Sequence, residues 1–452
     1  MKNFTIIGAG LVGTLQAVFL AKRGHRVQVF ERRPDMRTTN VYQGRSINLA
    51  LSHRGWKALE KVGIDDAIRK IAIPMYKRAM HDRNGNLTYQ QYGKDNQAIY
   101  SVSRGELNKT LLELADQHDN VTFHFNHRTS DVDLQHKKIH FNIENTGEKK
   151  EESYEYLIGT DGAYSAVRHR LMFTDRFNYS QYYIEHGYKE LHIESNADGS
   201  HKMEINALHI WPREDFMLIA LPNIDGSFTC TLFFSFEGKV SFEAIKTERD
   251  IISFFQYYFP DVIPMMPDFV EQFMKNPSSS LVTVRCEPWN YQDHVLLMGD
   301  AAHAIVPFYG QGMNAGFEDC RVFDEMIDAY SNNFDQFFAD YGKNRKPNGD
   351  AIASLALANF IEMRDLTADA DFLLRKKIEA KIHDKYPEKW TPLYTMVSFS
   401  HIPYSVALEE GKRHDVIMSE VMKTKNIHEN WNSEEIESLI LNLIEKNPSS
   451  YK

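Results

Sequence analysis

The first 31 residues constrain the fold of this chain more than any other stretch. Residues 4–7 are apolar and predict a short buried strand, which runs directly into the glycine-rich segment 8–13. An apolar helix is expected to follow as far as Arg23, and a second strand covers residues 26–30 and ends at Glu31. A strand, a G-x-G-x-x-G turn, a helix and a second strand with a terminal acid are the parts of a βαβ dinucleotide-binding unit.

Each part of this unit has a physical role in binding a dinucleotide. Gly8 permits the tight turn, Gly10 lets the backbone approach a pyrophosphate, and Gly13 lets the helix pack close to the strand. The start of the helix presents free N–H groups and a partial positive charge to the phosphates. Glu31 lies about 20 residues beyond the glycines, where an acid binds a ribose hydroxyl. The unit predicts an adenine dinucleotide without deciding between FAD and a nicotinamide, and a glycine-rich turn without a ligand is the alternative.

The net charge and the cysteines exclude several kinds of partner. The chain has 452 residues and a formal net charge of −10, so we expect neither nucleic acid nor an anionic membrane as a partner. Cys230, Cys286 and Cys320 lie far apart without metal-ligand spacing, so we expect no metal site and a reducing compartment. No apolar stretch is long enough to span a bilayer, and the expected location is the cytoplasm.

The hydrophobic pattern predicts an α/β protein whose nucleotide-binding layer is interrupted. We expect a Rossmann-like domain in three segments, residues 1–70, 99–176 and 288–370. Residues 371–452 show mixed charged and apolar faces and predict a C-terminal helical region.

The stretch between the second and third segments has a different pattern. Strands are expected at residues 203–211, 216–221 and 228–236, separated by turn residues. They predict an inserted antiparallel β-sheet, which with its flanks forms a substrate domain from residues 71–98 and 177–287.

A second and a third signal follow predicted strands. Asp161-Gly162 comes directly after the strand at 156–159, at the sheet edge where α/β proteins bind ligands, although an ordinary Asp-Gly turn is an equal alternative. Asp300 follows a buried strand in the same way and can accept a hydrogen bond from a ribityl hydroxyl. The segment 307–314, which includes Gly312, offers N–H groups at a helix start, suited to a flavin O2 or a pyrophosphate. His303 near Asp300 suggests a catalytic pair, but a structural histidine is favoured.

The order of these three signals resembles the FAD-dependent aromatic hydroxylases of the para-hydroxybenzoate hydroxylase fold. The resemblance implies tightly held, non-covalent FAD, because the disulfide reductases that share the first motif carry paired redox cysteines that this chain lacks. It also implies NADPH as a transient co-substrate, because the chain has no second G-x-G-x-x-G segment.

Within that class the chain resembles the kynurenine 3-monooxygenase family. The segments that carry this resemblance are residues 44–55, 186–191, 207–212, 359–363 and 392–397. The resemblance implies that NADPH reduces FAD, that the reduced flavin forms a C4a-hydroperoxide with O2, and that L-kynurenine is hydroxylated to 3-hydroxy-L-kynurenine.

The same resemblance implies which residues bind the substrate. Arg78 would hold the carboxylate of L-kynurenine, and Tyr92, Asn359 and Tyr394 would add hydrogen bonds to the zwitterion. Pro307 and Phe308 would form the loop beside the flavin ring, and Glu362 would support the substrate side from the helix face of Asn359.

For the cofactor, the match adds residues to the glycines and acids already named. They are Leu11, Glu31, Arg32 and Ala50 near the ADP half or the ring, Arg104 near the phosphate or ribityl region, and Asp300, Met313 and Asn314 on the ribityl and isoalloxazine side.

Two alternatives remain open from the sequence, a hydroxylase of another amino-aromatic acid and a non-catalytic FAD-binding regulatory protein. Animal and fungal relatives continue into an apolar membrane anchor, whereas this chain ends in a polar helical tail, so we expect a bacterial form without an anchor. Nothing in the sequence sets the oligomeric state, and a homodimer is one expectation.

Overall fold

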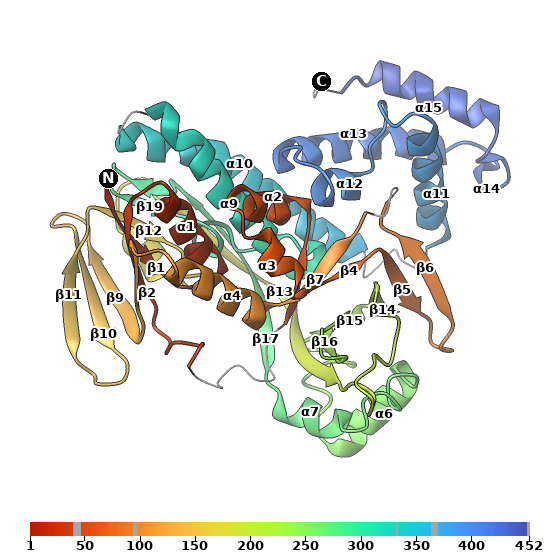
Figure 1. Ribbon diagram of the computed structural model, residues 1–452. Helices are drawn as coiled ribbons and strands as arrows, with labels where there is room; N and C mark the ends of the chain where they lie inside the picture. Colours follow the sequence, from red (N-terminus) through yellow and green to blue (C-terminus); the bar gives the residue numbers. More distant parts are fainter. Residues whose placement is uncertain (39–46, 94–96, 331–332, 363–368, 450–452) are drawn as a thin grey trace.

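The computed structural model describes residues 1–38, 47–93, 97–330, 333–362 and 369–449, which form a mixed α/β fold (Figure 1). The predicted fold class is confirmed: a Rossmann-like sheet, an inserted second sheet and a helical C-terminal region are all present. Four residues of the motifs named above, Gly44, Arg45, Ser46 and Met363, lie outside the described residues.

The first sheet has six strands and is built around β1. In order across the sheet the strands are β18 (Asn290–Tyr291), β19 (Val295–Leu297), β12 (Tyr156–Gly159), β1 (Asn3–Ile7), β2 (Arg26–Phe30) and β8 (Val121–His124). All neighbours run parallel except β18 and β19. Ile7 lies opposite both Gly159 and Phe30, so the carboxyl ends of β12, β1 and β2 meet at one edge. Sheets of this kind bind their ligands at that edge.

One hydrophobic core joins this sheet to helices from several parts of the chain. The larger of these helices are α1 (Leu11–Lys22), α2 (His53–Lys61), α4 (Arg104–Asp116), α9 (Gly312–Ile327) and α10 (Phe334–Ile361). Helix α1 packs against both α4 and α9, and its residues from Gly13 to Ala21 are all buried. This burial explains why the helix is apolar on every side rather than on one stripe.

Shorter elements complete this part of the chain. They are α3 (Asp65–Arg69), α5 (Ala166–Leu171), α8 (Asp300–His303) and an antiparallel meander of β9 (His127–Asp133), β10 (Lys138–Ile143) and β11 (Lys149–Ser153), which projects at one end of the molecule (Figure 1).

The second sheet has seven strands from the inserted region. In order they are β17 (Ser278–Glu287), β13 (Asn178–Ile193), β16 (Phe228–Ser235), β15 (Phe216–Pro222), β14 (Ala207–Arg213), β5 (Lys77–His81) and β6 (Leu87–Gln91). The sheet is antiparallel except for the parallel pair β14 and β5. Residues 203–206 precede β14 as turn and coil, so the strand is shorter than the predicted 203–211.

Helices and a small sheet flank the second sheet. Helices α6 (Glu248–Tyr258) and α7 (Phe269–Lys275) lie beside this sheet (Figure 1). They share a core with it that includes Trp211 and Phe234. A three-stranded sheet of β3 (Asn48–Leu51), β7 (Ile99–Ser103) and β4 (Ala72–Met75) is built from residues between β2 and β8.

The C-terminal region is helical, as predicted. It consists of α11 (Ala370–Lys385), α12 (Leu393–Ser398), α13 (Tyr404–Met422), α14 (Ile427–Asn430) and α15 (Glu434–Lys446). Its own core includes Ile378, Trp390, Met418 and Ile440, and α13 packs on α10. Within the described part of the chain, no helix combines the length and the apolar character needed to cross a bilayer.

Candidate active site

A cavity of about 370 Å³ is lined by segments that follow strands of the first sheet and by strands of the second sheet. It contains most of the predicted cofactor residues and most of the predicted substrate residues. The cofactor residues on its wall are Gly10, Leu11, Ala50, Arg104, Asp300, Gly312 and Met313, and the substrate residues are Arg78, Tyr92, Pro307, Phe308 and Tyr394. Residues from every predicted segment therefore meet in a single space of the size that small-molecule sites have.

The glycine turn opens onto this cavity. Gly10 has an extended backbone, and a Cβ atom added to it would meet no atom within 4 Å. No side chain caps the N-terminus of α1, so the first N–H groups of a 12-residue helix remain for a ligand. An uncapped helix start beside an open glycine suits a pyrophosphate, and these residues fit FAD.

Gly8 and Gly13 have structural roles in the same turn. Gly8 has φ of +100°, which an L side chain rarely adopts. A Cβ on Gly13 would lie 2.0 Å from the carbonyl oxygen of Gly8, so only glycine lets α1 follow β1 this closely.

Glu31 and Arg32 lie outside the cavity wall. The Glu31 carboxylate accepts hydrogen bonds from the N–H of Ala9 at 2.9 Å and of Arg33 at 3.0 Å. It therefore holds the glycine turn against the end of β2, next to the helix start. Arg32 is exposed.

Asp161 also uses its carboxylate inside the protein. It accepts hydrogen bonds from Ser165 Oγ at 2.5 Å and from the N–H groups of Ala166 at 2.7 Å and Val167 at 3.3 Å, at the start of α5. Burial raises the pKa of this carboxyl above its usual value. The backbone of Gly162, not the side chain of Asp161, reaches the cavity.

Asp300 and His303 lie in different environments and do not form a pair. Asp300 is the exposed first residue of α8 and lines the cavity, whereas His303 is buried. His303 Nε2 lies 2.6 Å from Asp319 Oδ2, and its ring stacks on Trp289 with centroids 5.1 Å apart. The favoured structural interpretation of His303 agrees with this placement.

The N-terminus of α9 forms another part of the wall. Gly312 and Met313 line the cavity, while the Asn314 side chain is fully buried behind them. Asn314 accepts from the N–H of Ser52 at 2.8 Å and donates to the carbonyls of Ala50 at 2.8 Å and Gly310 at 2.9 Å. Asn314 thus joins β3 to the loop before α9.

Arg78 lies among aromatic rings in the wall of the cavity. Its guanidinium carbon is 5.1 Å from the ring centroid of Tyr92 and 4.7 Å from that of Tyr394. The two rings stack at 5.5 Å, and Tyr309 stacks on Tyr394 at 5.6 Å. Such stacking orients a guanidinium without neutralising it.

The positive charge of Arg78 has no acidic partner in the part of the chain that the structure describes. Arginine is nevertheless always protonated in proteins. The Tyr92 hydroxyl is buried without a hydrogen-bond partner, and burial raises the pKa of Tyr92 above its usual value. An unpaired cation and an unpaired donor are costly unless a ligand completes them.

Asn359 acts on the cavity through the backbone of the adjacent loop. Its Nδ2 donates to the carbonyl of Phe308 at 2.8 Å. The Phe308 ring packs against Phe360 at 4.3 Å and Phe233 at 4.9 Å, and Pro307 precedes it in the wall. Asn359 itself is not among the wall residues.

Glu362 does not join this group. Its carboxylate pairs with Lys376 of α11 at 3.3 Å, and its side chain is 40% exposed. The structure therefore places Glu362 outside the cavity, and its support of the substrate stays a prediction.

An apolar wall from the second sheet was missed by the sequence analysis. It consists of Tyr188, Leu208, Ile210, Met217, Ile219, Leu221 and Phe233. Their alternation along β14 and β15 was visible in the sequence and indicated one face of a sheet. The sequence did not indicate that this face encloses a cavity rather than a solid core. Tyr309, which had no predicted role, also lines the cavity.

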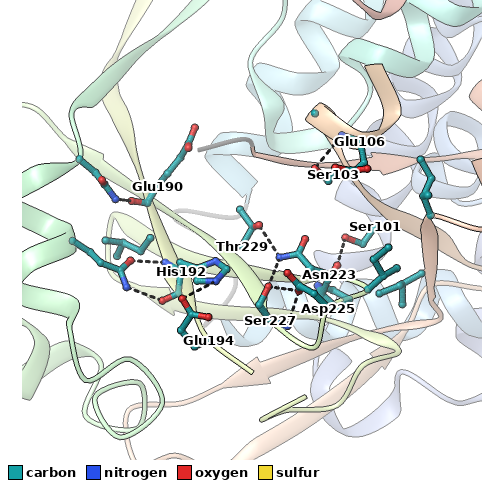
Figure 2. A pocket seen from close by; sticks show the side chains of 18 of the residues that line it. Ser101, Ser103, Glu106, Glu190, His192, Glu194, Asn223, Asp225, Ser227 and Thr229 are labelled. Carbon is teal, nitrogen blue, oxygen red and sulfur yellow. Dashed lines mark hydrogen bonds and ion pairs between the residues drawn. The ribbon is translucent and has the colours of Figure 1, made fainter. Parts of the chain in front are cut away.

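A larger groove of about 920 Å³ lies elsewhere, between α4, β13 and α7. Figure 2 shows that its polar side chains bond to one another: Asp225 accepts from Ser227 Oγ at 2.6 Å, and Asn223 donates to Thr229 Oγ1 at 3.1 Å. Six carboxylates and only three Lys or Arg residues line it, which disfavours a phosphate ligand. The smaller cavity, with its unpaired groups, is the candidate active site.

Comparisons with known proteins identify the kind of fold that holds this cavity. A family model described as an FAD binding domain matches residues 2–355. The tetrameric form of 2-methyl-3-hydroxypyridine-5-carboxylic acid oxygenase shares 17% identity with a TM-score of 0.66, covering 86% of this chain and 98% of that one. PqsL of P. aeruginosa, in complex with 2-aminobenzoylacetate, shares 19% identity with a TM-score of 0.65, covering 80% and 97%. The fold and this family model define a flavoprotein with an FAD binding domain.

Sequence relatives narrow the class. Kynurenine 3-monooxygenase of Christiangramia forsetii is 51% identical over 98% of this chain and 99% of its own. Those of Dictyostelium discoideum and Legionella pneumophila (strain Corby) are 44% and 41% identical, each over 97% of this chain and at least 96% of their own. The chain belongs to the kynurenine 3-monooxygenase family.

Proposed function

We propose that this enzyme hydroxylates L-kynurenine to 3-hydroxy-L-kynurenine, with FAD as its bound cofactor and NADPH and O2 as co-substrates. The observation that carries the proposal is the unpaired guanidinium of Arg78, which faces the same cavity as the open glycine turn. A guanidinium without an acidic partner and a nucleotide-binding turn in one cavity match a carboxylate substrate held beside a flavin.

The substrate carboxylate pairs with Arg78. A guanidinium presents two parallel N–H groups to a carboxylate, and the rings of Tyr92 and Tyr394 hold it in place. The buried Tyr92 hydroxyl, which has no partner in the protein, donates the additional hydrogen bond. Asn359 acts on the substrate indirectly, because it fixes the carbonyl of Phe308 in the wall.

The cofactor residues divide into backbone donors and side chains. The N-terminus of α1 would hold the pyrophosphate, Glu31 the ribose, Asp300 the ribityl chain, and Gly312 and Met313 at the start of α9 the flavin ring. When bound, FAD accepts hydride from NADPH and activates O2.

The protein itself orients the substrate and excludes water from it. Leu208, Ile210, Met217, Ile219 and Phe233 form an apolar wall over the substrate ring. Such a wall excludes water, and this prevents the activated oxygen from breaking down to hydrogen peroxide without hydroxylating the substrate. The amino group of L-kynurenine activates its own ortho carbon, so no protein base is needed for the attack.

Substrate-stimulated NADPH oxidation tests the proposal. The rate of NADPH oxidation by the holoenzyme is measured with L-kynurenine, with anthranilate and with para-hydroxybenzoate, and the products are separated by chromatography. We expect stimulation and a hydroxylated product with L-kynurenine only. Hydrogen peroxide without product would refute the proposal, and product from anthranilate would make the enzyme a hydroxylase of another amino-aromatic acid.

We also propose the cytoplasm as the location of the enzyme. Cys230, Cys286 and Cys320 are all free and buried, and burial raises the pKa of the Cys286 thiol to about 12. Free thiols of this kind are typical of proteins in reducing compartments.

A further inference from the structure

The short helix α12 carries Tyr394 into the cavity, and its last carbonyls accept hydrogen bonds from Arg54 and, at Met396, also from Ser400 Oγ at 2.6 Å. Arg54 donates from Nε to the carbonyl of Val397 at 3.0 Å and from Nη2 to that of Met396 at 3.3 Å. Nη2 also donates to the carbonyl of Ile402, just beyond the helix. The last carbonyls of a six-residue helix have no N–H donors within the helix, and Arg54 donates hydrogen bonds to two of them.

Arg54 is itself fixed in the nucleotide-binding part of the chain. It is fully buried in α2, and its Nη1 donates to Glu318 of α9 at 2.8 Å. Its guanidinium carbon lies 3.9 Å from the ring centroid of Tyr404, and the Tyr404 hydroxyl donates to Gln311 before α9 at 2.9 Å. The guanidinium thus bridges α2 and α9 to the segment 396–404.

This bridge joins the two halves of the candidate site. Helix α2 follows β3, which contributes Ala50 to the cavity, and α9 begins with the wall residues Gly312 and Met313. Tyr394 lines the same cavity, beside Arg78. Separate hydrogen bonds of Asn314 already hold β3 and α9 together, so the cofactor side does not depend on Arg54.

We infer that Arg54 is a positioning residue for the substrate: it places Tyr394 against Arg78 by holding the end of α12 to the FAD-binding elements. The inference rests on the proposed function for the identity of the substrate. Loss of the three carbonyl bonds releases Tyr394 and weakens substrate binding, while FAD remains bound.

Two substitutions test this role in the holoenzyme. Arg54→Lys keeps a cation beside Glu318 but cannot reach three carbonyls at once, and Arg54→Gln removes the charge as well. The dissociation constant of L-kynurenine is measured from the change in flavin absorbance on titration, and bound FAD is quantified per protein. We expect the dissociation constant to rise about tenfold in Arg54→Lys, with FAD content unchanged.

Arg321→Met is the matched control. Arg321 also donates to Glu318, at 3.3 Å, but its second partner is Glu325 of its own helix rather than α12. We expect this variant to bind L-kynurenine within twofold of the parent. A rise as large as that in Arg54→Lys would overturn the inference, because the effect would then come from the buried charge network in general.

Hydrogen–deuterium exchange gives a second readout that needs no substrate. The peptide covering residues 393–402 is expected to exchange faster in Arg54→Lys than in Arg321→Met. An unchanged dissociation constant with unchanged exchange would overturn the inference, as would failure of both Arg54 variants to accumulate as holoenzyme. If the parent itself fails to bind L-kynurenine, the proposed function falls, and the exchange rates still decide whether Arg54 positions Tyr394.

Discussion

The guanidinium carbon of Arg78 lies 4.7 Å from the ring centroid of Tyr394, although the two residues belong to β5 and α12, at opposite ends of the chain. A strand of the inserted sheet and a helix of the C-terminal region therefore build one binding site. Because Tyr394 also stacks on Tyr92 and Tyr309, its position sets the shape of this end of the cavity.

Replacing Arg78 is expected to weaken substrate binding without affecting FAD binding. Arg78→Met removes a paired charge contact worth about 2–3 kcal/mol, so we expect the KM for L-kynurenine to rise by about 30- to 150-fold while FAD stays bound. Lys77→Met is the control, because Lys77 pairs with Glu204 and lies outside the cavity wall. An unchanged KM in Arg78→Met would refute the proposal that Arg78 binds the substrate carboxylate.

Two glycines of the same turn are expected to respond differently to alanine. Gly10→Ala adds a methyl group to open space, so the apoprotein should melt within about 2 °C of the parent while FAD affinity falls at least tenfold. Gly13→Ala forces a Cβ to 2.0 Å from a carbonyl oxygen and should lower the melting temperature or prevent folding. Thermal melts of the apoproteins and FAD titrations measure both effects. Equal loss of stability in the two variants would contradict the division of roles.

Acid should destabilise the fold through a buried histidine. His209 is buried. Its Nδ1 shares a hydrogen bond of 2.9 Å with His81 Nε2, and its Nε2 lies 2.8 Å from the Glu204 carbonyl oxygen. Burial lowers the pKa of His209 from 6.5 to about 4. The neutral form stabilises the folded state above pH 6.5, and up to about 3 kcal/mol of this stability is lost as the pH falls toward 4.

Urea unfolding at several pH values between 7.5 and 4 measures that loss. His209→Gln should show a shallower decrease in the free energy of unfolding over this range, whereas a variant of the exposed His136, His136→Gln, should follow the parent. A parent curve that stays flat down to pH 4 would contradict the prediction.

Asn359→Ala should affect the coupling of NADPH oxidation to hydroxylation more than it affects substrate binding. The variant loses the hydrogen bond to the Phe308 carbonyl, worth about 1 kcal/mol, and so loosens the loop beside the flavin site. We expect more hydrogen peroxide and less hydroxylated product for each NADPH oxidised. The exposed Asn344 on the same helix offers the control Asn344→Ala, and equal coupling in both variants would argue against the role of Asn359.

Local sequence was sufficient for the elements and for the cofactor side of the site. The turn at Gly8, Gly10 and Gly13 depends on contacts within 31 residues, and the structure reproduces the predicted strand, turn, helix and strand. The loop from Pro307 to Gly312 likewise lies where its position after β19 indicated. Such features are predictable because neighbours in the chain determine them.

The acids of the motifs show the limit of this reasoning. Asp161 and Glu31 occur at the expected positions, yet their oxygens accept hydrogen bonds from α5 and from the glycine turn. A motif specifies where a carboxylate lies in the chain. Which donors surround it depends on how the neighbouring helices pack.

The sequence by itself determined that this is an α/β chain with a βαβ nucleotide-binding unit, an inserted sheet and a helical tail, and its motifs identified the family. Only the tertiary structure brought Arg78, Tyr92 and Tyr394 together, left the Tyr92 hydroxyl without a partner, and placed Glu362 outside. The physical reason is distance along the chain: contacts between β5, α10 and α12 depend on the packing of whole elements, through side chains such as Arg54, and no local pattern of residues encodes that packing.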